Sequence, residues 1–281
     1  MNPSSIDLHV HTTASDGTLS PADAVREAIA GGVALLGIAD HDTTDGIPPA
    51  LEAAHEIGLT LIPGVELSVG SGKREIHVLG YFVDVANTAL SRALAKLRGA
   101  RDLRNERILQ RLNDLGAPLD AARVQEIAGS GSVGRPHIAK ALVEAGHVSS
   151  EGEAFGRYLA RGKPAYVGRE RLSPAEASRV IREAGGIPVL GHPAKIGPRQ
   201  VIEGILDDGM GGIEVFHSDH DENDVALLMS IAQDRDLLIT GGSDSHGPHS
   251  DRPLAIGEVD IPEWVGEQVM GRAPRWWREG R

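Results

Sequence analysis

The chain has 281 residues, of which 41% are hydrophobic, a formal net charge of −12 and no cysteine. The negative charge disfavours a protein that coats duplex DNA through a basic surface, and the absence of cysteine excludes disulfides and thiolate metal ligands. No apolar run approaches the ~20 residues that span a bilayer, and residues 1–5 lack a signal-peptide pattern, so we expect a cytoplasmic protein with no membrane partner.

Short apolar runs alternate with helical patterns along most of the chain. The runs are rich in Val, Ile and Leu at successive positions, as in parallel strands that are covered on both faces. The predicted strands are residues 6–10, 33–39, 59–65, 76–82, 187–190, 212–216 and 237–240. Two predicted helices begin with the same signal, Ser20-Pro21 and Ser173-Pro174, in which serine caps the helix and proline occupies its first turn. This alternation predicts an α/β fold.

Residues 86–165 depart from this alternation. Leucine and isoleucine recur at helical spacing from Leu90 to Leu115, and further helical patterns cover residues 121–128 and 136–145. We therefore expect an all-helical insert over residues 86–165. It would divide a barrel made of residues 1–85 and 166–281 and would lie over the mouth of that barrel as a lid.

Ionisable residues at the strand ends favour a barrel over an open sheet. In βα barrels the chemistry gathers where the strands end, whereas an open sheet gathers its site at one switch point. Here such residues follow most of the predicted strands, and they are His9, His11, His41, Glu66, His192, Asp244 and His246. The seven strands are one fewer than in the standard eight-stranded barrel.

The same residues predict a metal site. His9 and His11 point to one face because side chains alternate along a strand, and Asp244 and His246 repeat that spacing near the last strand. Asp16 and His77 extend the set. Burying so many ionisable groups without a counterion would be very unfavourable, and divalent cations are the simplest compensation.

The motifs resemble those of the PHP (polymerase and histidinol phosphatase) family, within the amidohydrolase superfamily. They are His-x-His-Thr-x-x-Ser-Asp-Gly at residues 9–17, Asp40-His41-Asp42, Gly64-Val65-Glu66, Glu75-Ile76-His77, Gly191-His192-Pro193 and Ser243-Asp244-Ser245-His246. The resemblance covers nearly the whole chain and implies a distorted (β/α)7 barrel with three metal ions. It is strongest for a bacterial branch with a helical insert. Members of that branch dephosphorylate nucleoside 3′,5′-bisphosphates, and some trim short RNA from the 5′ end.

Carried over to this chain, the resemblance implies three groups of ligands that would also be the catalytic residues. The first ion would be bound by His9, His11, Glu66 and Asp244. The second would be bound by Glu66, His77 and His192, with Glu66 bridging the two ions. The third would be bound by Asp16, His41 and His246. Mn²⁺ is the expected metal, with Fe²⁺ or Zn²⁺ as alternatives.

Four further residues are predicted substrate contacts. Residues 132–137 open a helix of the insert, where free N–H groups favour an anion and Arg135 adds a bidentate donor for phosphate. Arg135 and His137 are therefore expected to bind a second phosphate, the alternative being an ordinary helix start. Lys163 is a weaker candidate that equally suits a solvated loop. His217 follows the sixth strand and is expected to contact substrate rather than metal.

Three other features of the sequence have more than one interpretation. Asp42 is expected to support His41 rather than bind metal, and Asp7 equally suits a structural role. Trp276 and Trp277 lie in a C-terminal segment with four arginines, Arg272, Arg275, Arg278 and Arg281. This segment would either stack on nucleotide bases or pack against the fold.

These residues predict metal-assisted hydrolysis of a phosphate ester, and the resemblance implies a small nucleotide substrate. Multi-metal sites activate water, and the chain shows neither a Gly-x-Ser-x-Gly nucleophile motif nor a phosphate-binding loop motif. The favoured reaction removes the 3′-phosphate of a nucleoside 3′,5′-bisphosphate, such as adenosine 3′,5′-bisphosphate. The alternatives are a 5′→3′ oligoribonuclease acting on short RNA ends, a histidinol-phosphate-type phosphatase, and a metal-binding module without catalysis.

Overall fold

The computed structural model describes residues 5–72, 74–129, 133–168, 171–250 and 253–279. The chain divides into two compact units. The barrel unit comprises Met1–Leu94 and Leu172–Arg281, and the helical unit comprises Ala95–Arg171. Each unit is described by itself below.

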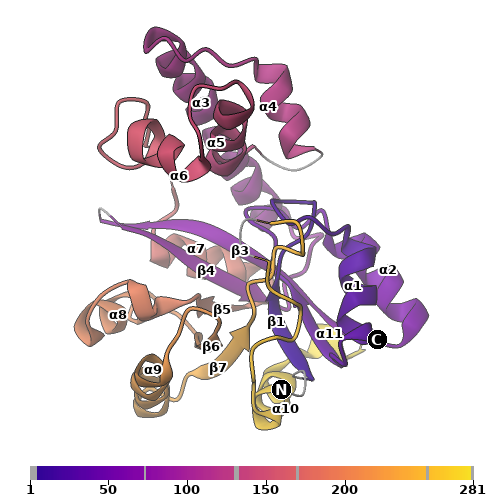
Figure 1. The fold of residues 1–281 in the computed structure, drawn as a ribbon. Coiled ribbons are helices and arrows are strands. Elements are labelled where there is room, and N and C mark those ends of the chain that lie inside the picture. The colour runs from indigo at the N-terminus through magenta and orange to yellow at the C-terminus, as the bar shows by residue number, and fades with distance from the viewer. Residues whose placement is uncertain (1–4, 73, 130–132, 169–170, 251–252, 280–281) are drawn as a thin grey trace. The chain divides into compact units, whose positions relative to one another are not determined.

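The barrel unit is built on a seven-stranded sheet in which each strand pairs with the next along the chain (Figure 1). The strands are β1 (Ile6–Val10), β2 (Leu35–Ile38), β3 (Thr60–Ser71), β4 (Arg74–Tyr81), β5 (Ile187–Leu190), β6 (Gly212–His217) and β7 (Leu238–Gly242). The last and first strands also approach each other: the His11 N–H donates to the Ser245 carbonyl at 2.9 Å, and the Asp244 N–H donates to the His9 carbonyl at 2.9 Å. The sheet is therefore a nearly closed barrel, which confirms the predicted fold class.

One strand runs against the predicted parallel direction. β4 is antiparallel to both of its neighbours, β3 and β5. Only two residues separate β3 from β4, and a parallel pair needs a crossover of a dozen residues or more, so a hairpin is the available connection. The hairpin places His77 opposite Ser68. It also extends β3 well past Glu66, which was predicted to end that strand and instead lies inside it.

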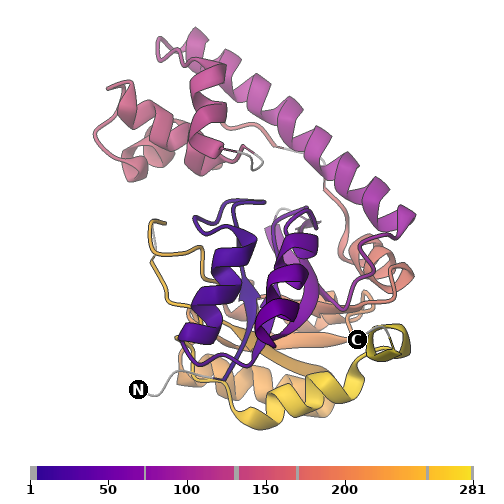
Figure 2. The same ribbon diagram turned by 90° about the vertical axis from the view of Figure 1, so that its right-hand side faces the viewer.

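Helices cover the strands of the barrel unit. They are α1 (Pro21–Ala30), α2 (Ile47–Ile57), α7 (Pro174–Glu183), α8 (Arg199–Leu206), α9 (Glu222–Asp234), α10 (Glu263–Arg272) and α11 (Arg275–Glu279), with a 3-10 turn at Pro193–Lys195. Both predicted starts are confirmed, because Ser20 and Ser173 accept a hydrogen bond from the first turns of α1 and α7. Figure 2 shows α1 and α2 side by side; their buried faces pack with Leu36 and Ile38 of β2.

The helical unit has its own apolar core. Its helices are α3 (Thr88–Asp114), which starts in the barrel unit, α4 (Ala121–Ala128), α5 (Arg135–Glu144) and α6 (Glu151–Ala154), followed by a π-helical turn at Phe155–Leu159. Ile108 and Leu112 of α3 pack with Ile138 and Leu142 of α5, all four fully buried. The described residues of this unit form no strand. α4 has the predicted bounds, and α5 begins at Arg135, so that Pro136 is its second residue rather than its first.

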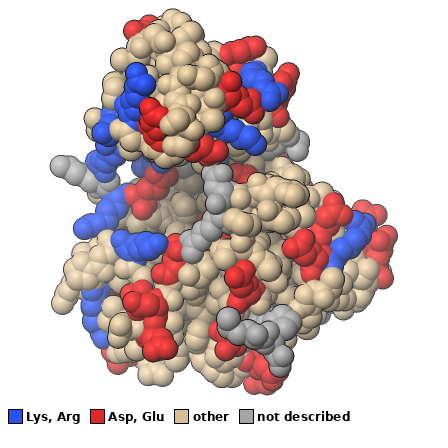
Figure 3. Space-filling model, in the orientation of Figure 1, with Lys and Arg blue, Asp and Glu red and all other residues tan. Residues whose placement is uncertain are grey.

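Charged side chains of both signs are interspersed on the face shown in Figure 3. Among the described residues, no helix combines the length and the apolar character needed to cross a membrane. The cytoplasmic location stays a prediction.

Candidate metal centre

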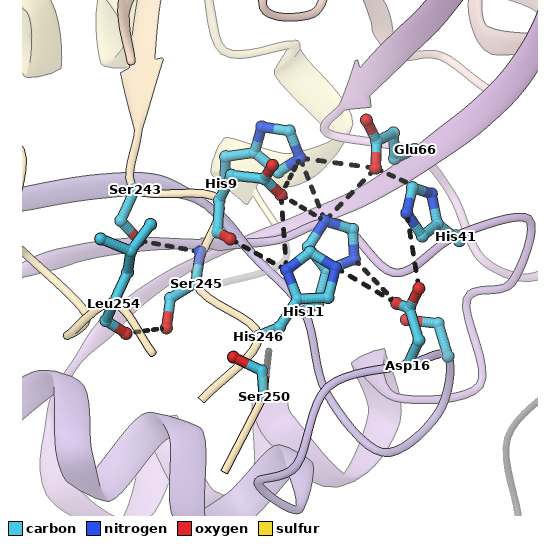
Figure 4. Close-up of polar contacts among 12 residues, drawn as sticks. His9, His11, Asp16, His41, Glu66, Ser243, Ser245, His246, Ser250 and Leu254 are labelled. Carbon is cyan, nitrogen blue, oxygen red and sulfur yellow. Dashed lines mark hydrogen bonds and ion pairs between the residues drawn. The ribbon is translucent and has the colours of Figure 1, made fainter. Parts of the chain in front are cut away.

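The barrel unit contains all nine predicted ligands, and they converge where its parallel strands end. His9 lies on β1, and His11 is the first residue after the end of that strand. His77 lies in the first half of β4 and reaches the same end only because β4 runs antiparallel. Figure 4 shows how these side chains turn toward one another, with His9, His11, Asp16, His41, Glu66 and His246 labelled. The strand order brings together residues that are far apart in the sequence.

Glu66 lies at the centre of the cluster with its side chain almost fully buried. Its Oε1 atom is 2.7 Å from His77 Nδ1 and 3.2 Å from His192 Nε2. Its Oε2 atom is 2.8 Å from His41 Nδ1 and 3.3 Å from His11 Nε2. The two carboxylate oxygens thus face two different sets of imidazoles, which is the arrangement of a carboxylate that bridges two cations.

A second group forms around Asp244. Its Oδ1 atom lies 3.0 Å from His11 Nε2 and 3.5 Å from His9 Nε2, and these two ring nitrogens are 3.2 Å apart. Potential ligand atoms of all three residues lie within 4.8 Å of one another. This spacing suits coordination of one ion by His9, His11 and Asp244.

A third group lies around Asp16, which comes from the loop after β1. Asp16 Oδ1 is 3.4 Å from His246 Nε2, and Oδ2 is 3.8 Å from His41 Nε2. His246 Nδ1 lies 2.9 Å from the Asp244 carbonyl, so a proton on Nδ1 leaves Nε2 as the free lone pair. His11 completes the group within the same 4.8 Å limit.

The donor set fits divalent cations. Four of the clustered residues have a buried side-chain atom that makes no hydrogen bond of normal geometry, although 2.8 Å separates two of these atoms, His41 Nδ1 and Glu66 Oε2. The four atoms are His11 Nδ1, Asp16 Oδ1, His41 Nδ1 and Glu66 Oε2. Buried polar atoms are normally satisfied, and exceptions need an explanation such as an ion. Imidazole and carboxylate are the ligands of zinc, iron and manganese, so the residues present fit a metal of that class.

Opposite charges perturb one another strongly in this cluster. Burial alone would lower the pKa of His9 and His11, but the carboxylates outweigh it. Glu214 and Asp244 raise the pKa of His9 well above its usual value, and Asp244 and Glu66 raise the pKa of His11 to about 10. Without metal, His9 and His11 therefore hold protons in place of the cations.

The carboxylates shift in the opposite direction. Burial alone would raise the pKa of Glu66 and Asp16, but the charge of His41 and its neighbours outweighs it and holds both well below the usual range. The pKa of Asp244 is likewise held low, chiefly by His9 against the effect of burial. All three carboxylates are ionised at neutral pH and available to a cation.

Comparison with known proteins decides the family. Residues 7–120 match the PHP domain. A 5′-3′ exoribonuclease from Haemophilus influenzae is 37% identical over 267 residues, which are 92% of this chain and 97% of that protein. The chain belongs to the PHP family.

Other PHP relatives act on phosphate esters. A 3′,5′-nucleoside bisphosphate phosphatase from Chromobacterium violaceum is 34% identical, over 86% of this chain and 87% of that protein. A structure described as that of a metal-dependent phosphoesterase from Bifidobacterium adolescentis superposes with a TM-score of 0.87 at 32% identity, covering 98% of both chains. A structure of an amidohydrolase from C. violaceum, with bound sulfate and no metal, gives 0.83 at 31% identity, covering 94% of this chain and 97% of that one. The protein is a metal-dependent PHP phosphoesterase, a hydrolase of phosphate esters.

Two residues of the PHP centre have backbone conformations that are strained for residues other than glycine. His192, after β5, has φ 26°, and Asp244, after β7, has φ 57°. Such conformations cost about 1–3 kcal/mol each and persist where the surrounding structure enforces them, often at functional sites. Both residues are predicted ligands, whereas Asp42, Phe82 and Asp236 have positive φ angles without being predicted ligands.

Buried carboxylates support the loops that carry the ligands. Asp40 accepts hydrogen bonds from the Thr12 N–H at 2.7 Å and the Ser15 hydroxyl at 2.6 Å, which shapes the loop between His11 and Asp16. Asp42 accepts from the Ser68 N–H at 2.9 Å. Neither group was predicted to bind metal, and these contacts give both a structural part at the PHP centre.

Asp7, on β1, has a comparable structural role where β1 approaches the segment after β7. Its carboxylate accepts from the Ser243 N–H at 2.9 Å and the Gly257 N–H at 2.8 Å. Burial raises its pKa despite these hydrogen bonds. Asp7 thereby ties β1 to the segment that presents Asp244, in agreement with the structural interpretation of this residue.

Sequence reasoning missed Glu214. This residue lies in the middle of β6, is fully buried and contacts His9 Nδ1 at 3.0 Å. A charged residue inside an otherwise apolar parallel strand was the available signal. His217, predicted as a substrate contact, lies beside it: its Nε2 is 3.6 Å from Asp244 Oδ2 and has no hydrogen-bond partner.

The remaining predicted substrate contacts belong to the helical unit. The Arg135 guanidinium lies 5.9 Å from the centroid of the Tyr166 ring, and the Gly134 N–H donates to His137 Nδ1 at 3.0 Å, so His137 caps its own helix. Lys163 is exposed. Ser132, at the start of this motif, lies outside the described residues. The parts of these three residues in substrate binding stay predictions.

The C-terminal segment packs through one of its tryptophans. Trp277 is buried, and its ring meets Phe82 edge-on with 4.9 Å between centroids. Trp276 is 42% exposed, with its Nε1–H directed at the Gly185 carbonyl at 3.5 Å. Arg281 lies outside the described residues. The packing interpretation holds for Trp277, whereas stacking on bases stays open for Trp276.

Proposed function

We propose that this PHP protein removes the 3′-phosphate of nucleoside 3′,5′-bisphosphates, such as adenosine 3′,5′-bisphosphate, to give the 5′-monophosphate and phosphate. The observation that carries the proposal is Glu66, whose two oxygens face two sets of imidazoles within one buried cluster. Sites of this kind serve in-line displacement at phosphorus. The relative from C. violaceum named for this activity supports the choice of substrate.

Three divalent ions would be held as the family resemblance implies. His9, His11, Asp244 and Glu66 would hold the first, Glu66, His77 and His192 the second, and Asp16, His41 and His246 the third. Bound divalent ions would lower the pKa of a water molecule and neutralise charge on the phosphate. We favour Mn²⁺, with Fe²⁺ or Zn²⁺ as alternatives.

The protein's own residues would attract the cations and orient the phosphate. The ionised carboxylates of Glu66, Asp16 and Asp244 create a buried anionic site that favours cations over a free phosphate anion. In the reaction a water oxygen bonds to phosphorus, the bond to the 3′ oxygen breaks, and one proton of the water ends on that oxygen. We propose that His217, whose Nε2 is buried 3.6 Å from Asp244 Oδ2, donates a hydrogen bond to a phosphate oxygen.

The second phosphate would be bound by the helical unit. We propose that Arg135, with His137 and Lys163, binds the 5′-phosphate, and that the helical insert acts as a lid. Arginine suits this role because its planar guanidinium forms two parallel hydrogen bonds with one phosphate. A lid of this kind favours mononucleotides or short chain ends over long polymers.

A substrate panel tests this proposal. Metal-reconstituted protein is assayed with adenosine 3′,5′-bisphosphate, 3′-AMP, 5′-AMP and histidinol phosphate, and products are identified by phosphorus NMR. We expect the highest kcat/KM for the bisphosphate, with phosphate and 5′-AMP as products. A far better kcat/KM for histidinol phosphate would contradict the proposal. No turnover of any ester would indicate a metal-binding module without catalysis.

A 5′→3′ oligoribonuclease is the second candidate. It is favoured by the H. influenzae relative, which is named as a 5′-3′ exoribonuclease and covers 92% of this chain. The deciding measurement uses a 5′-phosphorylated RNA of about five nucleotides in competition with adenosine 3′,5′-bisphosphate. Stepwise release of 5′-mononucleotides at a higher kcat/KM than bisphosphate hydrolysis would make the exoribonuclease the main activity.

A further inference from the structure

Glu214 contacts predicted ligands of two proposed metal positions, His9 and His192, without being one of the predicted ligands. It belongs to β6, and its side chain is fully buried. One oxygen, Oε1, lies 3.0 Å from His9 Nδ1, and the other, Oε2, accepts the backbone N–H of His192 at 2.7 Å. Both carboxylate oxygens are therefore engaged by residues that carry ligand atoms.

The contact with His9 decides which nitrogen of that ring can bind metal. A neutral imidazole has one N–H donor and one lone pair. When Nδ1–H is donated to Glu214, the lone pair is on Nε2, the atom that faces Asp244 at 3.5 Å and His11 Nε2 at 3.2 Å. Metal-binding histidines almost always donate their other N–H to a carboxylate, a carbonyl or a water in this way.

The contact with His192 acts through the backbone. His192 has φ 26° and ψ 59°, outside the regions that residues other than glycine adopt freely. Its N–H donates to Glu214 Oε2 at 2.7 Å. This hydrogen bond stabilises the strained conformation that directs His192 Nε2 to Glu66 Oε1 at 3.2 Å.

We infer that Glu214 is a positioning residue that orients ligands of two metal positions at once, His9 through its ring and His192 through its backbone. The inference rests on the proposed metal centre. His217, the third residue near Glu214, accepts the Asp219 N–H on Nδ1 at 3.0 Å. In the neutral ring its proton is then on Nε2, so His217 offers no lone pair to a further ion. His9, Glu214 and His217 thus form a supporting layer rather than a fourth metal site.

The substitution Glu214→Gln tests this double role. Glutamine has the same shape but only one acceptor oxygen, so it can satisfy either the His9 Nδ1–H or the His192 N–H but not both. Loss of such partners typically lowers metal affinity about 10–100-fold. We expect Mn²⁺ binding, measured by equilibrium dialysis and elemental analysis, to weaken by that factor for at least one ion. The full complement should return at proportionally higher free Mn²⁺.

A matched control and a second variant make the result specific. Glu203→Gln removes a carboxylate that pairs with Arg199 at 2.8 Å on α8, outside the cluster, and should bind Mn²⁺ like the wild type. Glu214→Asp keeps both acceptors on a shorter side chain and should weaken binding as well, because the carboxylate no longer spans both donors. Wild-type affinity in Glu214→Gln would overturn the inference. An ion that is not recovered at any free Mn²⁺ would also overturn it, because Glu214 would then be a ligand.

The tautomer of His9 provides a test that needs no variant. In the wild-type protein loaded with diamagnetic Zn²⁺, ¹⁵N NMR of the histidine rings should show His9 protonated at Nδ1 and coordinated at Nε2. Coordination through Nδ1 would overturn the inference. These measurements do not depend on turnover: a protein that binds metal as described but does not hydrolyse bisphosphates would refute the proposed substrate and leave the role of Glu214 intact.

Discussion

Among the described residues both units bury polar side chains, but of different kinds: the barrel unit buries histidines and carboxylates, whereas the helical unit buries Arg101, Arg104 and Asn105 of α3. The helical unit packs an apolar core in which Ile108, Ile138 and Leu142 are fully buried. The barrel unit has a comparable apolar core but also buries His9, Glu66 and Glu214 in one cluster. Apolar burial stabilises folding, whereas buried charges stabilise it only when they are paired or coordinate metals. The comparison indicates that the polar cluster serves chemistry and that its buried charges are compensated by one another or by cations.

The largest expected effect comes from Glu66→Gln, which removes the charge shared by two sets of imidazoles. Loss of a residue that only hydrogen-bonds to a metal ligand typically lowers metal affinity or activity about 10–100-fold. Loss of a bridging ligand should therefore lower kcat/KM more than a hundredfold. The readouts are kcat/KM and metal content at fixed free Mn²⁺. Near wild-type values for both would refute the bridging role.

Asp16→Asn should lower activity less than Glu66→Gln does, because Asp16 belongs to only one of the three proposed ligand groups. We expect most of the activity to be lost and the content to fall by one ion, while the circular dichroism spectrum and the remaining ions are retained. The physical reason is that His9, His77 and Asp244 do not depend on the loop that carries Asp16. Full activity together with a full metal content would show that Asp16, His41 and His246 do not share an ion.

Arg135→Ala should impair binding of the second phosphate, which we assign to the helical unit, without impairing metal binding by the barrel unit. A lost hydrogen bond to a charged group is worth ~1.5–3 kcal/mol, which corresponds to roughly a ten- to hundredfold increase in KM for a bisphosphate. KM for a substrate with one phosphate and the Mn²⁺ affinity should change little. Arg123→Ala is the matched control, since Arg123 pairs with Glu126 and Glu144 on the surface of the helical unit. An equal rise in KM for both substrate types would show that Arg135 does not bind the second phosphate.

The last prediction concerns the pH dependence of metal binding and needs no substitution. Because the pKa of His11 is raised to about 10, this ring is protonated at neutral pH in the metal-free protein and must lose its proton to bind metal. Apparent metal affinity should therefore rise about tenfold per pH unit for each proton displaced. The raised pKa also stabilises the metal-free protein at low pH, and this contribution is lost as pH rises toward 10.

As pH rises, metal affinity should increase while the stability of the metal-free protein decreases, and this difference can be measured directly. The gain in thermal stability on adding Mn²⁺ should grow between about pH 6 and pH 8. Calorimetric titrations in buffers with different ionisation enthalpies should show proton release on metal binding. A gain in stability that shrinks over this range, or uptake of protons, would contradict the assignment of His11.

The sequence by itself determined the strands and the residues of the centre. Periodicity and cap signals are local, so they located seven strands and the starts of α1 and α7 without tertiary information. The motifs at the strand ends likewise singled out nine residues that the fold brings into one cluster, because a barrel collects the ends of its parallel strands at one rim.

The tertiary structure alone decided how those residues meet. The direction of β4 depends on its pairing with β3 and β5, which a periodicity of two cannot reveal. The two-residue connection exists only because β3 extends past residue 65, where the predicted strand ended. Glu214 and His9 are 205 positions apart, and their contact exists only because β6 and β1 belong to the same closed sheet. Local patterns report which side chains can be buried, whereas the partner of a buried charge is set by long-range pairing, and at this site that pairing orients the predicted metal ligands.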